Sequence, residues 1–469
     1  MDIKQEIEDI SISDFDENSN DNIKLILGDY KKALIKLALP LLLSTFVMAS
    51  YIIMDAIWVA GLGARSLAAL GFVTPVYMFA VSISNGIGAG VTSLISRCIG
   101  ARDKKESDKS ATQALTLALI LSIILTVFLL LIQEPLLYIM GAGSVLSEAT
   151  AYSTIIFAGL ITLMFSGTSM GILRAEGDVK RAVYVMIFTC FLNAVLDPIF
   201  IYVTGWGIAG AALATILSSL LSIVLFLYWI IVKKDTFVKF KVKYLKPNWR
   251  IMKDILVVGI PSTMETILFS LLVTVLNLVL VFIGTLNDVA VLTAGFRILL
   301  FAMIPLTALA SSTLIVTATT YGGKDFKKLS NVLSYSTKLS FTLAIILGVL
   351  IFIFAPQISF LFTYADETRY LIEPIVNFLR IMSLFIIFDP IGAIASSYFQ
   401  GMGKGFTSLA LNILRYVIII FPICIILAIV FNFKSMGIWY GIALGNFIGI
   451  ILAGIYTFSY SKKLLKYNQ

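Results

Sequence analysis

Apolar residues come in long runs along this chain, separated by short polar loops. Between Leu37 and Tyr456 the runs are about 20 residues long, and each is long enough to cross a bilayer as a helix. They are centred near residues 48, 82, 121, 161, 191, 220, 268, 303, 343, 385, 418 and 447. The pattern predicts an all-α integral membrane protein with twelve transmembrane helices.

Lysine and arginine are concentrated in every second loop. The loops that follow the even-numbered apolar runs are basic, most strongly in residues 233–253, and the loops between them carry almost no positive charge. Basic loops stay on the cytoplasmic side of a membrane. We therefore expect a multi-pass protein of the plasma or inner membrane, with both termini in the cytoplasm.

The second half of the chain repeats features of the first. Leu39-Pro40 recurs as Ile260-Pro261, and Ile99-Gly-Ala-Arg-Asp103 recurs as Tyr321-Gly-Gly-Lys-Asp325. Such repeats are typical of secondary transporters. The sequence predicts two pseudo-symmetric six-helix bundles, divided as a flexible acidic cytoplasmic tail (1–30), an N-lobe (31–232), a basic linker (233–253) and a C-lobe (254–469).

The composition excludes several chemistries. Apolar side chains make up 59% of the 469 residues and charged ones 13%, with a mean hydropathy of +0.98. There is no histidine, which excludes His-based zinc sites and Ser-His-Asp triads. The net charge of +8 lies in the loops rather than on a nucleic-acid-binding face, and no nucleotide-binding loop is visible. We expect no cofactor and no nucleic acid partner.

Carboxylates within the apolar runs are the strongest functional signal. A charge at that depth is costly unless it is paired or hydrated, and chains rarely carry such a residue without a use for it. Asp55 and Asp197 both lie about 10 Å below the predicted outer face. Asn193 lies one helical turn before Asp197, and Thr215 lies at a comparable depth on the next helix. We predict a proton-coupling or cation-binding site formed by Asp55, Asn193, Asp197 and Thr215.

The repeat places this site in the N-terminal half, since the residue that corresponds to Asp55 in the second half is Leu276. Glu265 and Asp389 form a candidate second ion site, with structural acids as the open alternative. Pro198 and Pro40 each remove a backbone donor and are predicted to bend their helices. The alternating glycines of residues 86–90 predict close helix packing.

Three motifs in order along the chain resemble the multidrug and toxic compound extrusion (MATE) family. They are Tyr51-x-x-x-Asp55-x-Ile-Trp-Val-Ala-Gly-Leu-Gly63, Gly171-Ile-Leu-Arg-Ala-Glu-Gly177 and Asn193-x-x-x-Asp197-Pro-Ile-Phe-Ile-Tyr202. The resemblance spans nearly the whole chain after residue 30. It is nearest to the archaeal and DinF-like branch.

The resemblance implies a V-shaped pair of bundles that exports drug-like, often cationic compounds in exchange for protons or sodium. It places the family's cation site on the same four residues, with Tyr51 nearby, and matches Pro40 to a proline whose bending is linked to substrate release. The chain has Met170 where some archaeal relatives have asparagine. Asp389 matches an acid of another branch, and Glu265 is out of register with that branch's second acid.

We therefore interpret the chain as a monomeric antiporter for amphiphilic organic cations, and not as an enzyme. Whether protons or sodium drive it stays open, since carboxylate, amide and hydroxyl oxygens suit either ion. One alternative is a lipid-linked precursor flippase, although the intramembrane basic residues that would meet its pyrophosphate are scarce, with Arg297 and Arg415 as the main candidates. Another is an intramembrane aspartyl protease using Asp55 and Asp197, although the Tyr-Asp and Gly-x-Gly-Asp patterns are missing.

Overall fold

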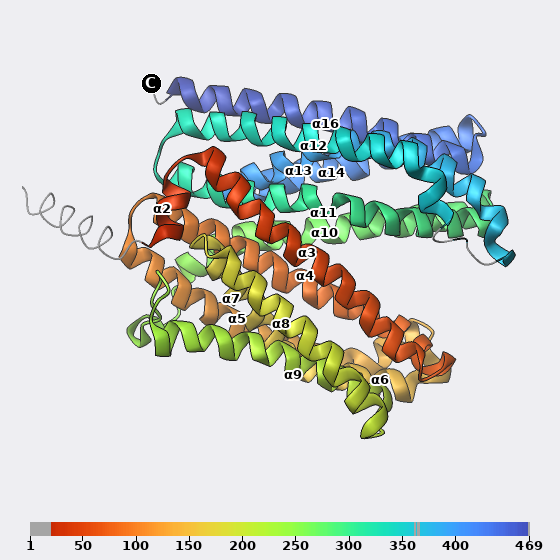
Figure 1. Ribbon diagram of the computed structural model, residues 1–469, viewed down its shortest axis with the longest axis horizontal. Coiled ribbons are helices and arrows are strands. Elements are labelled where there is room, and N and C mark those ends of the chain that lie inside the picture. Colours follow the sequence, from red (N-terminus) through yellow and green to blue (C-terminus); the bar gives the residue numbers. More distant parts are fainter. Residues whose placement is uncertain (1–19, 361–362, 364–365, 468–469) are drawn as a thin grey trace, which may run out of the picture. The chain divides into compact units, whose positions relative to one another are not determined.

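The computed structural model describes residues 20–360, 363 and 366–467, and this part of the chain is helical without any β-strand (Figure 1). The first helices are α2 (Asp21–Leu27), α3 (Tyr30–Ala60), α4 (Ala64–Gly100), α5 (Lys104–Ile139), α6 (Leu146–Ala158), α7 (Leu160–Ala175), α8 (Val179–Pro198) and α9 (Gly207–Leu227). They are followed by α10 (Trp249–Ile283), α11 (Leu286–Gly322), α12 (Phe326–Phe360), α13 (Ile372–Gly401), α14 (Gly405–Ile413), α15 (Phe421–Ile425) and α16 (Lys434–Tyr467).

Length and hydropathy confirm a polytopic membrane protein. Within the described ranges, 11 helices are long and apolar enough to cross a membrane, and there are 12 spans if the bent pair α6–α7 counts as one. The two helices of that pair meet at an angle of 47°. The predicted all-α class and helix count are therefore confirmed, with the fourth span built from two pieces.

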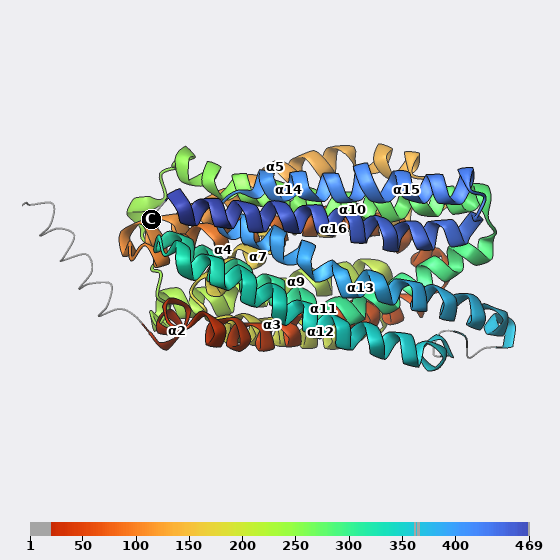
Figure 2. The same ribbon diagram turned by 90° about the horizontal axis from the view of Figure 1, so that it is seen from above.

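The chain forms two compact units. The first contains Leu39–Thr263 and the segment that ends at Asp29, and the second contains Tyr30–Ala38 and the chain from Met264 onward. Within each unit the long helices run roughly along a common direction (Figures 1 and 2). The predicted lobe boundaries stay a prediction, with one visible difference: residues 233–253 belong with the first unit, because Phe237 and Val238 are buried in it.

The predicted acidic tail contains a short helix. Residues 1–19 lie outside the described residues, but Asp21–Leu27 forms α2, whose first turn is capped when the Asn20 side chain accepts a hydrogen bond from Ile23 N at 3.0 Å. Ile23 and Ile26 are completely buried. The prediction of a flexible segment through residue 30 is therefore wrong for these residues, since their apolar side chains pack into the first unit.

Small and hydroxyl side chains hold α4 closely against α7. Ser84 Oγ donates to Leu163 O at 2.9 Å, and Thr92 Oγ1 donates to Gly171 O at 3.0 Å. Between these contacts, a Cβ on Gly88 would lie only 2.9 Å from Gly167 O. This face of α4 therefore has no room for a larger side chain.

The neighbouring glycines of α4 face a different helix. A Cβ on Gly86 would lie 2.1 Å from Thr263 Oγ1, and a Cβ on Gly90 would lie 2.3 Å from Ile255 O. Both contacts involve the first part of α10. The prediction of close helix packing is confirmed, and the alternation lets α4 pack against two helices at once.

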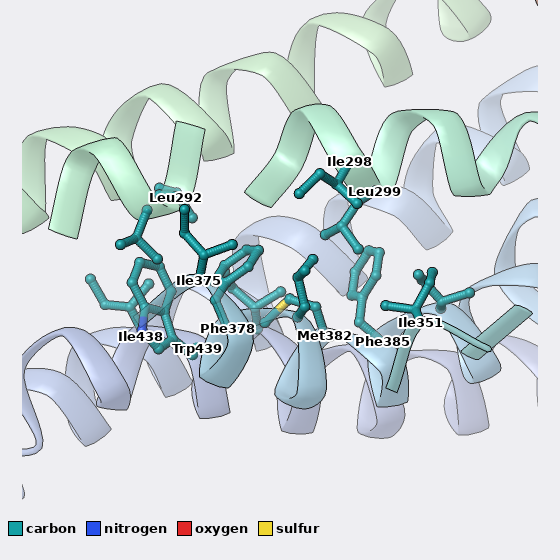
Figure 3. Close-up of a cluster of buried hydrophobic side chains, with 14 of the residues drawn as sticks. Leu292, Ile298, Leu299, Ile351, Ile375, Phe378, Met382, Phe385, Ile438 and Trp439 are labelled. Carbon is teal, nitrogen blue, oxygen red and sulfur yellow. The ribbon is translucent and has the colours of Figure 1, made fainter. Parts of the chain in front are cut away.

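The second unit is built around α13. Figure 3 shows Phe378, Met382 and Phe385 of this helix between side chains of α11, α12 and α16. The rings of Phe378 and Trp439 meet edge to face with centroids 4.9 Å apart. This apolar core sets the positions of the polar residues that follow on α13.

The loop between α9 and α10 is held by a buried carboxylate at its first turn. Glu176, completely buried after the end of α7, accepts hydrogen bonds from Phe237 N at 3.0 Å and Val238 N at 2.8 Å. Asp108 on α5 accepts another from Lys239 N at 2.8 Å. These side chains stand in for the backbone partners that a loop lacks.

Burial raises the pKa of Glu176 to about 8, against the opposite effect of the two backbone donors. A raised pKa means that the folded protein holds this proton more tightly than the unfolded chain does. The contribution to stability is therefore full below about pH 4.3 and declines as the pH rises to about 8.

We expect the thermal midpoint of the purified protein to fall more steeply between pH 6 and pH 8.5 in the wild type than in Glu176→Gln. The glutamine side chain keeps one oxygen that can accept a hydrogen bond from the loop, and it has no carboxyl group to titrate. Thermal unfolding in detergent at several pH values measures the difference. Parallel pH profiles for the two proteins would show that Glu176 does not titrate in this range.

Candidate functional site

Asn193 and Asp197 lie on one face of α8, as their spacing predicts. Asn193 Nδ2 donates a hydrogen bond to Asp197 Oδ1 at 3.3 Å. The two residues are 1% and 0% exposed. The amide therefore orients one carboxylate oxygen and leaves the other for a further partner.

Two other helices bring the remaining predicted residues to the same place in the first unit. Tyr51 OH of α3 lies 3.5 Å from Thr215 Oγ1 of α9, which also donates to Ala211 O at 3.2 Å. Asp55, one turn beyond Tyr51, is close enough to interact electrostatically with Tyr51 and with Asp197. We call Tyr51, Asp55, Asn193, Asp197 and Thr215 the acidic cluster.

The acidic cluster contains oxygen atoms whose hydrogen-bonding capacity is unused. Asp55 Oδ1, Asn193 Oδ1 and Asp197 Oδ2 are buried and have no hydrogen-bond partner among the residues that the structure describes. A buried carboxylate without a donor or a cation is costly. A proton, or a sodium ion bound by these carboxylate, amide and hydroxyl oxygens, would satisfy it. The donor set therefore fits either coupling ion.

Two tyrosines at this site were not predicted from the sequence. Tyr77 of α4 and Tyr152 of α6 both interact electrostatically with Asp55. They bring two further helices to the neighbourhood of this carboxylate. Tyr77 lies in an apolar run with no acid at helical spacing, and the acid one turn before Tyr152 is Glu148 rather than Asp55, so the sequence carried no signal that joins either tyrosine to Asp55.

The backbone changes character directly after Asp197. Pro198 ends α8, and Ile199–Val203 continue as the π-helical segment η2, in which Thr204 N donates to Ile199 O at 3.0 Å. Tyr202 OH then donates to Trp58 O of α3 at 2.6 Å. Proline and π-helical turns both loosen regular helix bonding. Pro40 lies within continuous α3, where that helix passes from one unit to the other.

The second unit holds its two intramembrane acids in separate hydrogen-bond networks. Asp389 forms an ion pair with Arg415, and both are almost fully buried. Arg415 Nε also donates to Asn446 Oδ1 at 2.7 Å. Glu265 instead accepts from Gln400 Nε2 at 3.1 Å. Within the described part of this unit no hydrogen bond joins Glu265 to Asp389, although Tyr416 interacts electrostatically with both, and the second ion site stays a prediction.

Comparison with known proteins decides the family. The family model described as MatE matches residues 40–199 and 261–426, which is more than half of the chain. The chain belongs to the MatE family. The resemblance noted from the three motifs is thereby confirmed, while the archaeal or DinF-like branch stays a prediction. As a MATE transporter, the protein moves small molecules across a membrane, requires no cofactor and is not an enzyme.

Curated relatives cover most of this chain. It is 24% identical to the multidrug export protein MepA of Staphylococcus aureus (strain MRSA252) over 413 residues, covering 87% of this chain and 89% of MepA. It is 25% identical to an FAD transporter of Shewanella oneidensis over 415 residues, covering 85% and 88%. These names describe different cargoes, so family membership does not identify the substrate of this MATE transporter.

A solved structure supports the architecture. An outward-facing multidrug resistance MATE transporter of the MOP superfamily is 36% identical to this chain, with a TM-score of 0.91. The match covers 96% of this chain and 99% of that one. The prediction of a two-lobe transporter fold is therefore confirmed.

Proposed function

We propose that this MATE transporter exports amphiphilic organic cations in exchange for protons or sodium ions, with the acidic cluster as the coupling site. The observation that carries the proposal is the set of buried oxygens on Asp55, Asn193 and Asp197 that lack hydrogen-bond partners in the part of the chain that the structure describes. The name of the relative MepA, a multidrug export protein, supports the same class of substrate. We also propose a monomer in the cell membrane with both termini in the cytoplasm.

The chemistry of the acidic cluster provides a means of exchange. Two carboxylates that interact electrostatically in a buried environment are stabilised by a positive charge or by a proton. A coupling ion and a cationic substrate both satisfy this need, so binding of one weakens the requirement for the other. Such mutual exclusion makes the two fluxes opposite in direction.

The membrane potential drives this exchange when net charge crosses the membrane, as when two coupling ions enter for each monovalent cation that leaves. One elementary charge that moves through about 100 mV provides about 2.3 kcal/mol. At about 1.4 kcal/mol for each factor of ten, this sustains a substrate gradient of around fiftyfold. Export at that level would keep a toxic cation well below its external concentration.

The flippase alternative is weakened by the environment of Arg415. A flippase cavity needs positive charge that is available to a pyrophosphate group. The charge of Arg415 is offset by Asp389 within hydrogen-bonding distance. Binding of a pyrophosphate there would first require this buried ion pair to break.

We expect purified protein in liposomes to accumulate a fluorescent organic cation against its own concentration gradient when an opposing ion gradient is imposed. The proton gradient and the sodium gradient are tested separately, and the one that drives uptake is the coupling ion. Protein-free liposomes and ionophores that collapse each gradient are the controls. Uptake that does not respond to either gradient would refute ion-coupled antiport.

A further inference from the structure

The segment of residues 239–253 has an unusual composition for its length. It contains six basic residues and no acid, since Asp235 precedes it and Asp254 follows it. Asp235 is bound by both terminal nitrogens of Arg181 at 2.9 Å, so its charge is already offset. The basic members are Lys239, Lys241, Lys243, Lys246, Arg250 and Lys253. We call residues 239–253 the basic platform.

Hydrogen bonds from side chains of α5 fix the backbone of the basic platform. Gln113 Nε2 donates to Tyr244 O and to Lys246 O, the latter at 2.9 Å, and Gln113 Oε1 accepts from Asn248 N at 2.8 Å. Asp108 accepts from Lys239 N at 2.8 Å. Both of these α5 side chains are 1% exposed. The backbone of the basic platform is thus held in a defined conformation.

The outward side of the basic platform combines charge with apolar surface. Lys239, Lys243 and Lys246 are exposed. Val242 is 72% exposed and Trp249 is 71% exposed. Lysine heads beside exposed apolar side chains are the arrangement that binds a charged bilayer surface, where the heads meet phosphate and the apolar groups enter the interface.

The position of Trp249 decides which partner fits. Trp249 is the first residue of α10, a helix long and apolar enough to span a membrane. Tryptophan at the end of such a helix lies at the level of the lipid headgroups. The platform therefore lies where phosphate groups of the same bilayer are already present.

We propose that the basic platform is a preorganised binding surface for anionic phospholipid headgroups of the leaflet that surrounds this end of the first unit. The surface goes beyond the proposed export function, since it contains none of the residues of the acidic cluster. It gives the protein a preference for an anionic bilayer that does not depend on which ion or cargo it transports.

The test uses full-length protein in nanodiscs that contain dibrominated phosphatidylglycerol or dibrominated phosphatidylcholine, which quench nearby tryptophan. The contribution of Trp249 is the difference between the wild type and Trp249→Phe. In the wild type we expect half-maximal quenching at a mole fraction of phosphatidylglycerol at least fivefold lower than that of phosphatidylcholine, a preference that salt reduces. Equal quenching by the two lipids would overturn the proposal.

Two triple variants show whether the lipid preference comes from the basic platform or from the net positive charge of the protein. The triple variant Lys239→Gln, Lys243→Gln and Lys246→Gln is expected to reduce the preference to below twofold. The matched triple variant Lys327→Gln, Lys462→Gln and Lys466→Gln makes the same change in net charge and is expected to keep the preference. Equal loss in both would mean that the protein's overall charge, and not the platform, attracts the lipid.

Gln113→Ala tests the preorganisation without any change in charge. It removes the side chain that holds Tyr244, Lys246 and Asn248, so we expect the preference to fall about as far as in the platform triple variant. An unchanged preference in Gln113→Ala would show that the fixed backbone is not required. If this variant does not fold, as judged by size-exclusion chromatography, the comparison of the two triple variants still decides whether the surface exists.

Discussion

Replacing Asp197 with Asn is expected to abolish gradient-driven export, so that dye accumulation falls to the level of protein-free liposomes. Asparagine has nearly the shape of aspartate, and its side-chain oxygen can still accept the hydrogen bond from Asn193 Nδ2, which spans 3.3 Å in the wild type. The negative charge and the proton-accepting oxygen are lost. Since coupling requires a group that binds the ion in one step and releases it in the next, nothing in this position would then respond to the gradient.

The size of the effect follows from the surroundings of the carboxylate. Asp197 is completely buried, and its Oδ2 has no hydrogen-bond partner among the described residues. Water cannot substitute for a missing charge at such a place as it would on a surface. Loss of the charge is therefore expected to stop transport rather than to slow it.

The measurement compares dye accumulation by the wild type and Asp197→Asn under a proton gradient and under a sodium gradient. Glu148→Gln is a matched control, because it neutralises an acid of the same unit that pairs with exposed Arg65 at 2.9 Å. The control is expected to transport normally. Wild-type accumulation by Asp197→Asn under both gradients would exclude it as the coupling residue and would direct attention to Glu265.

Much of the fold and part of the site could be predicted because both depend on local patterns. Apolar runs of about 20 residues have few outcomes besides membrane spans, which is why the all-α class and the helix count were right. Asn193 and Asp197 could be placed on one face because a spacing of four residues closes one helical turn. The structure then confirmed this placement with a hydrogen bond.

The rest of the site depends on contacts between distant segments. Tyr77 and Tyr152 come near Asp55 only because α3, α4 and α6 share one apolar core in the first unit. The burial of Glu176 depends on a loop that follows 61 and 62 residues later. No periodicity within a helix reports such contacts. The sequence therefore predicted which residues are costly to bury and missed their partners.

Arg415 illustrates the same limit with a larger consequence. As a sequence feature it was a candidate for a flippase cavity, and Asp389 was a candidate for a second ion site. The structure pairs them, 26 residues apart, with Asn446 as a third member. Gly392 leaves room for the guanidinium, since a Cβ there would lie 2.8 Å from Arg415 Nη1, and Gly449 leaves room for the start of the side chain, since a Cβ there would lie 3.0 Å from Arg415 Cγ. A site shaped around the arginine indicates a fixed internal cation.

Removing that cation alone is expected to destabilise the protein strongly. Arg415→Met leaves Asp389, which is 4% exposed, without its positive partner, and breaking one side of a buried ion pair costs about 3 to 5 kcal/mol. The double variant Arg415→Met and Asp389→Leu removes both charges and is expected to recover most of the loss, because an apolar pair of similar volume needs no compensation. Thermal midpoints measured by fluorescence-detected size-exclusion chromatography compare the two variants with the wild type.

Transport by the double variant then separates a structural pair from a coupling site. If Asp389 only balances Arg415, the double variant is expected to export the dye at close to the wild-type rate, because the acidic cluster of the first unit is intact. Loss of gradient-driven export in a double variant that is as stable as the wild type would show that Asp389 takes part in ion coupling. An Arg415→Met protein with an unchanged thermal midpoint would instead refute the buried ion pair itself.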